Sequence, residues 1–229
     1  GHPMTDSPYR AFKEKLCTFA DGQAGIRNPF VIVAVNPEIE HQTVDRLSGW
    51  ATGSDEPPTI DEDISIQPIW LDELLPQTKV YNLCVALGSE TSPERIEGTM
   101  QDRLAEELVQ EMIENEIDEE QLNQQNHVVL LLNIGSLYPF TRASELFDEL
   151  DRRNVRSTIG IPYPGDDVGG KLSFFDGDSR HYYPAHQIPG PITEKKSRRS
   201  TPTNGLRPTS SSSTRRRVQS AFSLNLERL

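Results

Sequence analysis

Long apolar runs, cysteine and clustered metal ligands are all scarce in this chain. No apolar stretch approaches the roughly 18 residues of a membrane-spanning helix, and no signal-peptide pattern is present, so we expect no contact with a membrane. The two cysteines, Cys17 and Cys84, cannot form a disulfide framework, which favours a reduced, cytoplasmic environment. The five histidines lack metal-ligand spacing, so we predict no zinc site and no cofactor.

Charge is distributed unevenly along the chain. Residues 193–229 contain nine Lys or Arg and two Glu, a net charge of +7, whereas residues 1–192 contain 14 basic and 33 acidic residues, a net charge of −19. A body this acidic repels nucleic acid and anionic membranes at long range, and it suits a basic protein partner. Solubility, or a salt-rich cytoplasm, explains the same composition without any partner.

The length and composition predict one α/β domain, over residues 8–190, between two flanking segments. Residues 1–7 begin with three residues ahead of Met4 that are typical of a cloning scar, and they form a short lead into the domain. Residues 191–229 form a basic, Ser- and Arg-rich tail, which we expect to be flexible.

The tail divides into two parts. Residues 193–217 offer almost no core-forming side chain, which predicts disorder in the isolated protein. Residues 218–229 carry a candidate docking motif, whose apolar residues fit either an added strand or one face of a helix. We predict that this motif docks on a partner or on the acidic body by a contact that salt weakens, and that the basic clusters make at most a weak, non-specific contact with DNA. The candidate tail contacts are Arg215, Arg216, Arg217, Phe222, Leu224 and Leu226.

The apolar run that begins after His127 predicts a strand buried on both faces, followed by a turn and a helix. We expect this strand, at 128–134, to be central in a mainly parallel sheet, with other strands at 30–35, 64–70 and 156–161 and a closing hairpin from 172 to 188. The predicted fold class is a three-layer α/β domain resembling a P-loop or Rossmann-like fold without Walker motifs. Helices are predicted from Pro8, from Glu38 to Trp50, from Leu71 to Leu75, from Pro93 to about Ile117 and from about Thr141 to Arg153.

The segment from Gly165 to Lys171 fits the spacing of a phosphate-binding loop, G-x-x-x-x-G-K. Leu172 stands where Ser or Thr would hold Mg²⁺, and the following residues predict a strand instead of the helix that a P-loop requires. Asn133 ends the central strand where a Walker-type ATPase would carry an acid. A hairpin loop is therefore the favoured interpretation, and a nucleotide-dependent enzyme is the alternative.

Two further residues near the central strand have side chains that could carry chemistry. Ser136 lies in Ile-Gly-Ser-Leu-Tyr, which lacks the second glycine of a hydrolase elbow and has no matched acid and base, so we interpret it as a turn residue. Arg142 can meet a carboxylate or phosphate beyond the strand end, or it can form a structural salt bridge. We predict no catalytic residue and no enzyme activity.

A set of motifs in the second half of the chain resembles the BrxB family of bacteriophage exclusion (BREX) systems. The segments are LLLNIGSLYPFTRASELFDEL, then IPYPG, then LSFF and HYYPAHQI. The resemblance covers about residues 8–190, and it is most specific from 128 to 188. Its matching positions are Gly135, Tyr138, Pro139, Phe140 and Arg142, then Pro162 to Gly165, then Leu172, Phe175, Tyr182 and Tyr183.

The resemblance implies a small, non-enzymatic adaptor in an anti-phage defence complex. Neighbouring components in such systems include an alkaline-phosphatase-like protein (PglZ), a large AAA-type ATPase and an adenine methyltransferase. We expect the partner-binding surface at the carboxyl edge of the sheet. The candidate interaction residues are Gly135, Ser136, Tyr138, Pro139, Phe140, Arg142, Tyr163, Pro164 and Gly165.

Overall fold

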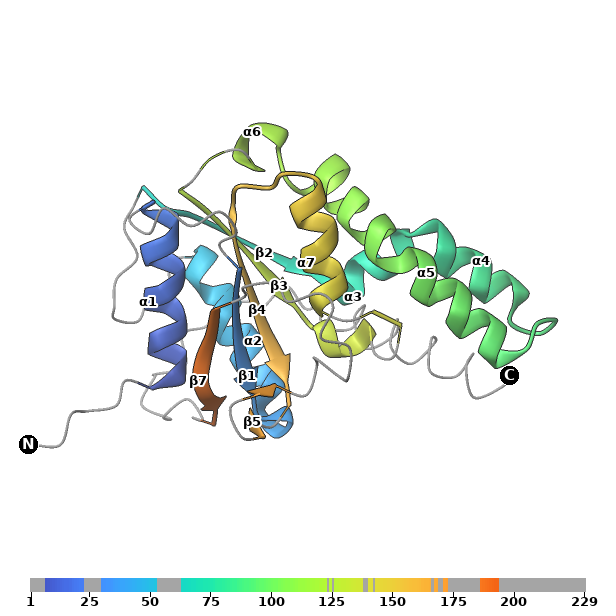
Figure 1. The fold of residues 1–229 in the computed structure, drawn as a ribbon, viewed down its shortest axis with the longest axis horizontal. Coiled ribbons are helices and arrows are strands. Elements are labelled where there is room, and N and C mark those ends of the chain that lie inside the picture. Colours follow the sequence, from blue (N-terminus) through green and yellow to red (C-terminus); the bar gives the residue numbers. More distant parts are fainter. Residues whose placement is uncertain are drawn as a thin grey trace, which may run out of the picture.

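In the computed structural model, five parallel strands form one open sheet with helices on both faces (Figure 1). The strand order is β2-β3-β4-β1-β7, which confirms the predicted three-layer α/β class. The structure describes residues 7–22, 30–52, 63–122, 124, 126–137, 140–141, 143–165, 167–168, 171–172 and 186–193. The strands of the sheet are β1 (Phe30–Val35), β2 (Ser65–Trp70), β3 (His127–Leu132), β4 (Thr158–Pro164) and β7 (His186–Ile192).

The α-helices lie before and between the first four of these strands along the chain. They are α1 (Pro8–Ala20), α2 (Glu40–Ser48), α3 (Leu71–Leu74), α4 (Lys79–Leu87), α5 (Pro93–Glu111), α6 (Glu119–Leu122) and α7 (Ala143–Arg152). Helices α3 to α6 all lie between β2 and β3. A π-helical turn, Met112–Glu116, extends α5, and a 3₁₀ turn, Ile134–Leu137, follows β3. The predicted Ser-Pro starts of α1 and α5 are confirmed, and Ser7 caps α1 by accepting the Arg10 N–H at 3.3 Å.

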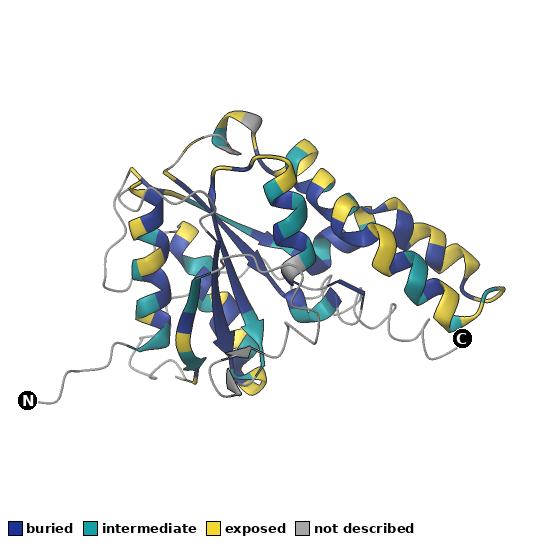
Figure 2. Ribbon diagram, viewed as in Figure 1, coloured by how far each residue is buried: buried dark blue, intermediate teal, exposed yellow. Residues whose placement is uncertain are grey.

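Side chains alternate across the sheet and build two cores. In β1, Phe30 and Ile32 pack with α3, α4, α5 and α7, whereas Val31 and Val33 pack with α1 and α2. Strands buried on both faces must be apolar at consecutive positions, which is why β1 and β3 read as unbroken apolar runs. Figure 2 shows the strands buried at the centre and the exposed residues on the outer faces of the helices.

Two predictions about the sheet need correction. Strand β3 lies inside the sheet, between β2 and β4, but β4 holds the middle position. The predicted hairpin from 172 to 188 is wrong at its second arm, because residues 186–188 begin β7, which pairs in parallel with β1. Residues 173–185 lie outside the described part of the chain, and a two-residue antiparallel pair, β5 (Asp167–Val168) with β6 (Lys171–Leu172), precedes them.

The α4–α5 pair is an antiparallel helical arm that projects beyond the sheet (Figure 1). Its direction follows from two contacts: the Val80 N–H donates to Glu107, and Cys84 approaches the carbonyl of Ile96. The sequence pattern assigned no element to α4, so the arm is a finding of the structure. The predicted tail contacts, all beyond residue 193, lie outside the described residues.

Candidate interaction surface

The carboxyl ends of the parallel strands meet at one edge of the sheet, and the turns that follow them are tied together there. The Gly165 N–H, after β4, donates to the carbonyl of Val35 at 3.0 Å, and the Asn36 N–H, after β1, donates to that of Ile192 at 3.0 Å. This edge is where open α/β sheets bind ligands or partners, because the loops of several strands converge on it.

Asn133 organises the turn after β3. Its backbone lies in the left-handed region, at φ 62°, which Asn tolerates better than most residues. The side-chain amide donates to Oδ1 of Asp72 at 3.2 Å, and both residues are buried. The carbonyl of Asn133 accepts the Ser136 hydroxyl at 2.6 Å and the Ser136 N–H at 3.1 Å. The position of a Walker-type acid is therefore occupied by an amide that joins β3 to the start of α3.

Gly135 allows the turn after β3 to approach β4 and α2 closely. A Cβ atom at this position would lie 3.0 Å from Cγ of Pro164 and 3.5 Å from Oε1 of Glu40. The distance to Pro164 is tighter than most real Cβ contacts, so a side chain at this position would require Pro164 to move by a few tenths of an ångström. Gly135, Pro164 and Glu40, from three separate parts of the sequence, thus meet at one point of the edge.

Two acidic residues that the sequence did not single out lie at this edge. Glu40, in the first turn of α2, is half-buried, and burial raises the pKa of its carboxyl above the ordinary value of 4.5. His41 lowers this pKa, whereas the negative charge of Asp72 raises it. The sequence places each of these two acids a few residues after a predicted strand, which was the one sign of their position at this edge. The strand order of the sheet is what brings them together.

The predicted interaction residues divide into three groups. Gly135, Ser136, Tyr163, Pro164 and Gly165 are half-buried at the edge, where a partner can contact them. Phe140 is a correction: only 1% of it is exposed, because it packs into the core against the α5 and α7 side of the sheet. Tyr138, Pro139 and Arg142 lie outside the described residues.

The segment Gly165–Lys171 does not have the architecture of a phosphate-binding loop in its described part. It follows β4, but Lys171 and Leu172 form β6, which pairs with β5. In a P-loop this lysine begins a helix whose backbone N–H groups hold phosphate. Across the described ranges, no group of three His, Cys, Asp or Glu is placed to hold a metal ion, and no helix is long and apolar enough to cross a membrane.

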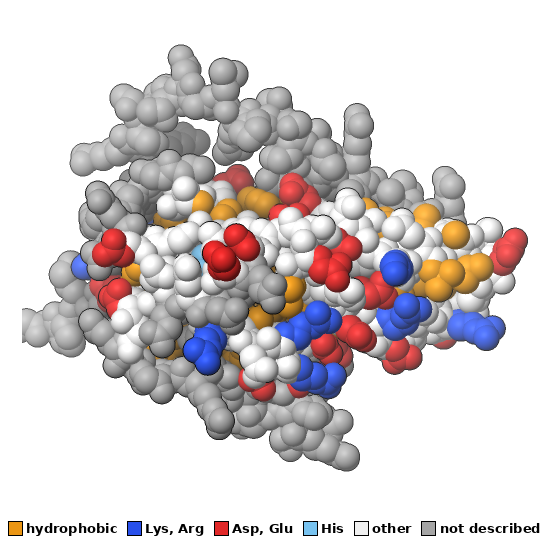
Figure 3. All heavy atoms as spheres, turned by 90° about the horizontal axis from the view of Figure 1, so that it is seen from above, with side chains coloured by type: hydrophobic (Ala, Val, Ile, Leu, Met, Phe, Trp, Pro, Cys, Tyr) orange, Lys and Arg blue, Asp and Glu red, His pale blue; other side chains and the backbone are white. Residues whose placement is uncertain are grey.

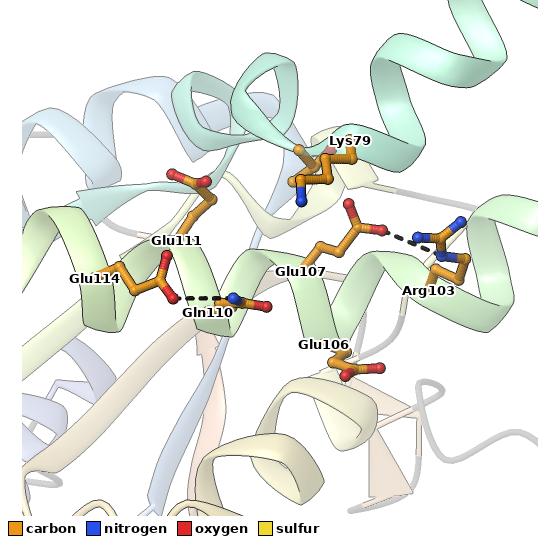
Figure 4. A pocket seen from close by; sticks show the side chains of 8 residues that line it. Lys79, Arg103, Glu106, Glu107, Gln110, Glu111 and Glu114 are labelled. Carbon is orange, nitrogen blue, oxygen red and sulfur yellow. Dashed lines mark hydrogen bonds and ion pairs between the residues drawn. The ribbon is translucent and has the colours of Figure 1, made fainter.

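A second surface feature lies on the α4–α5 arm, where a cleft of about 220 Å³ opens between the helices. Glu107 anchors it, since Oε1 accepts the Val80 N–H at 2.9 Å and Oε2 lies 3.4 Å from Nε of Arg103. Lys79 of α4 lies beside the glutamates of α5, and together these residues enclose the pocket (Figure 4). The lining residues are Thr78, Lys79, Arg103, Glu106, Glu107, Gln110, Glu111 and Glu114.

A comparison with known protein families shows which family this chain belongs to. A family model described as "BREX protein BrxB" matches residues 63–188, which is more than half of the 229 residues. The chain belongs to the BrxB family. Comparison with curated proteins and with solved structures gave no match.

The matched segment of this BrxB-family chain runs from the residues before β2 into the first part of β7. It therefore contains the Asn133–Asp72 contact, Gly135, Pro164 and the whole α4–α5 arm. Helix α1, strand β1, helix α2 and the basic tail lie outside it. Family membership confirms the predicted resemblance and assigns the chain to bacteriophage exclusion, an anti-phage defence.

Proposed function

We propose that this chain is a non-catalytic adaptor of a BREX complex, and that it binds other defence proteins through the carboxyl edge of its sheet. The observation that carries the proposal is that the polar groups at this edge hydrogen-bond to one another. Asn133 bonds to Asp72, and the Ser136 hydroxyl bonds to the carbonyl of Asn133. These groups hold the turns in place, which favours a rigid recognition surface.

Two side chains at the edge also suit a protein-binding surface. Tyr163 contributes a partly buried aromatic ring next to Pro164, and aromatic side chains are enriched where proteins bind one another. Glu40 adds negative charge to an already acidic body, so the favoured partner presents a basic surface. The alkaline-phosphatase-like PglZ and the AAA-type ATPase are the partners that we propose.

Co-purification from cells that express the whole defence cluster tests this function. The tagged wild-type chain should recover at least one other defence protein. Gly165→Arg should reduce that recovery at least about tenfold, because it places a bulky cation on the proposed surface, and its Cβ would meet only the Tyr163 ring at 3.6 Å.

Gly98→Arg is the matched control for this experiment. A Cβ at Gly98, on α5, would have no atom within 4 Å, so the same substitution is made away from the sheet edge and without a clash. Its recovery of partners should equal that of the wild type. Recovery of no defence component by the wild-type chain, or equal losses in both variants, would refute the adaptor proposal at this edge.

The alternative of a nucleotide-dependent enzyme has its own measurement. We expect no ATP binding by isothermal titration calorimetry, since Lys171 lies in a strand and not at the start of a helix. Micromolar binding that disappears in Lys171→Ala would replace the adaptor proposal with an enzymatic one.

A further inference from the structure

Helix α4 exposes large apolar side chains. Among the residues that the structure describes, the large apolar side chains that remain exposed are Leu83, Val85 and Leu87, at 42%, 40% and 38%, and all three belong to α4. Figure 3 shows apolar side chains gathered towards the end of the molecule that the α4–α5 arm occupies, with charged side chains around them. Neighbouring apolar side chains on an exposed helix make that helix a candidate docking surface.

The apolar stripe and the acidic cleft are continuous. Lys79, Leu83 and Leu87 are spaced by four residues, so they lie on one stripe of α4. Lys79 also lines the cleft, which places the cleft at the amino end of that stripe. Val85 lies about 160–200° around the helix from the two leucines, on the opposite flank. From the amino end of α4, the surface thus presents the cleft first, where the four glutamates outnumber Lys79 and Arg103, and the two leucines second, over about 12 Å.

The chain's own tail has the complementary order. Arg215, Arg216 and Arg217 come first, and Phe222 and Leu226 follow with the spacing of one helix face. From Arg217 to Leu226 a helix rises about 13 Å, close to the length of the α4 stripe. A helix that runs parallel to α4 would therefore place its arginines at the Glu106–Glu114 cleft and its apolar residues on Leu83 and Leu87.

We propose that residues 215–229 dock as a helix along the α4–α5 arm of the same chain. This inference goes beyond the adaptor function and does not depend on it. Charge favours this occupant over a second copy of the domain, because the tail carries +7 and residues 1–192 carry −19. The face of a nine-residue helix is also too small for the roughly 800 Å² per partner of a stable dimer.

The linker allows the contact. The 21 residues from 194 to 214 span up to roughly 70 Å when extended. A domain of this length has a radius of gyration of only about 16 Å, so the tail reaches any part of its surface. Tethering supplies an effective concentration near the millimolar range, at which even a weak contact forms.

Methyl and amide NMR of the full chain tests the docking with matched variants on both partners. In the wild type, amides of 218–229 should show restricted motion. Phe222→Asp and Leu226→Asp in the tail should release the tail, with the docked-to-free ratio falling at least about tenfold. Leu83→Asp and Leu87→Asp on α4 should do the same. Each release should also shift the remaining Leu83 or Leu87 methyl signals.

Two control substitutions lie off the proposed contact faces. Leu224→Asp is about 160–200° from Phe222 and Leu226 on a helix, and Val85→Asp is on the opposite flank of α4, so both should leave the tail docked. The proposal would be overturned if the control variants released the tail as much as the test variants do. It would also be overturned if no tail substitution shifted the methyl signals of Leu83 and Leu87.

A dilution series tests whether the contact lies within one chain. Docking that does not depend on protein concentration supports a contact within the same chain. Docking that is lost on dilution would show that the tail binds a second copy, which would overturn the proposal.

Discussion

The carboxyl edge of the sheet and the α4–α5 arm use their side chains in opposite ways. At the edge, turns from distant parts of the sequence are locked against one another, with Asn133 bonded to Asp72 and Gly135 pressed against Pro164. On the arm, Leu83 and Leu87 face outwards, and Gly98 has open space around it. A rigid surface is suited to recognising one shape, whereas an open amphipathic face is suited to a segment that orders on contact. The following substitutions separate the two regions.

The largest effect is expected at Asn133. Asn133→Ala removes the amide that donates to buried Asp72, and it leaves an alanine in the left-handed region, so we expect a loss of roughly 2–4 kcal/mol in the free energy of unfolding. Asn133→Gly removes the same bond without the backbone strain, and it should lose about 1–2 kcal/mol less. Urea denaturation measures both variants. Equal stability of Asn133→Ala and wild type would show that the contact does not hold the edge together.

The next-largest effect on stability is expected from valine substitutions at two glycines, one at the edge and one on the arm. Gly135→Val forces two methyl groups towards Pro164 and Glu40 and should cost roughly 1–3 kcal/mol by urea denaturation. Gly98→Val, the same change on the arm, should be within about 0.5 kcal/mol of wild type, because no atom lies within 4 Å of its Cβ. Similar losses in the two variants would remove the distinction between a packed edge and an open arm.

A smaller effect of opposite sign is expected from Gly98→Ala. Gly98 lies in the interior of α5, where glycine loses more backbone entropy on folding than alanine does. The substitution should stabilise the protein by about 0.5–1 kcal/mol, which a thermal melt detects as a higher Tm. A lower Tm would mean that the surroundings of α5 are tighter than they are in this structure.

The smallest effect concerns pH and Glu40. Because its pKa is higher in the fold than the ordinary 4.5, the folded state binds this proton more tightly than the unfolded state does. The resulting loss of stability is absent below pH 4.5, grows as pH rises through the folded pKa and is complete above it. Glu40→Gln should therefore raise Tm at pH 7 and leave it unchanged well below pH 4.5. The same change in Tm at both pH values would contradict this linkage.

The sequence predicted the parts of the fold that local chemistry determines. Continuous apolar runs located β1 and β3, because a strand covered on both faces is apolar at successive positions. Ser-Pro pairs located the starts of α1 and α5. Helix α4 was missed because its exposed face is also apolar, so the sequence 79–87 has no clear helical alternation.

Features that depend on distant contacts could not be predicted in the same way. Strand β7 contains Pro189 and Pro191, which weaken a strand signal, and its place beside β1 at the sheet's end tolerates them. Glu40 and Asp72 become neighbours only through the strand order. Phe140 resembled an exposed turn residue, but it folds into the core after the 3₁₀ turn Ile134–Leu137.

Hydrogen–deuterium exchange on the purified defence complex tests the central claim, that the carboxyl edge is the partner-binding surface. Compared with the free chain, the complex should show slower exchange at residues 134–137 and 163–165 and unchanged exchange in α4, residues 79–87. Slower exchange in α4 with no change at the edge would contradict the account, because it would place the partner on the arm.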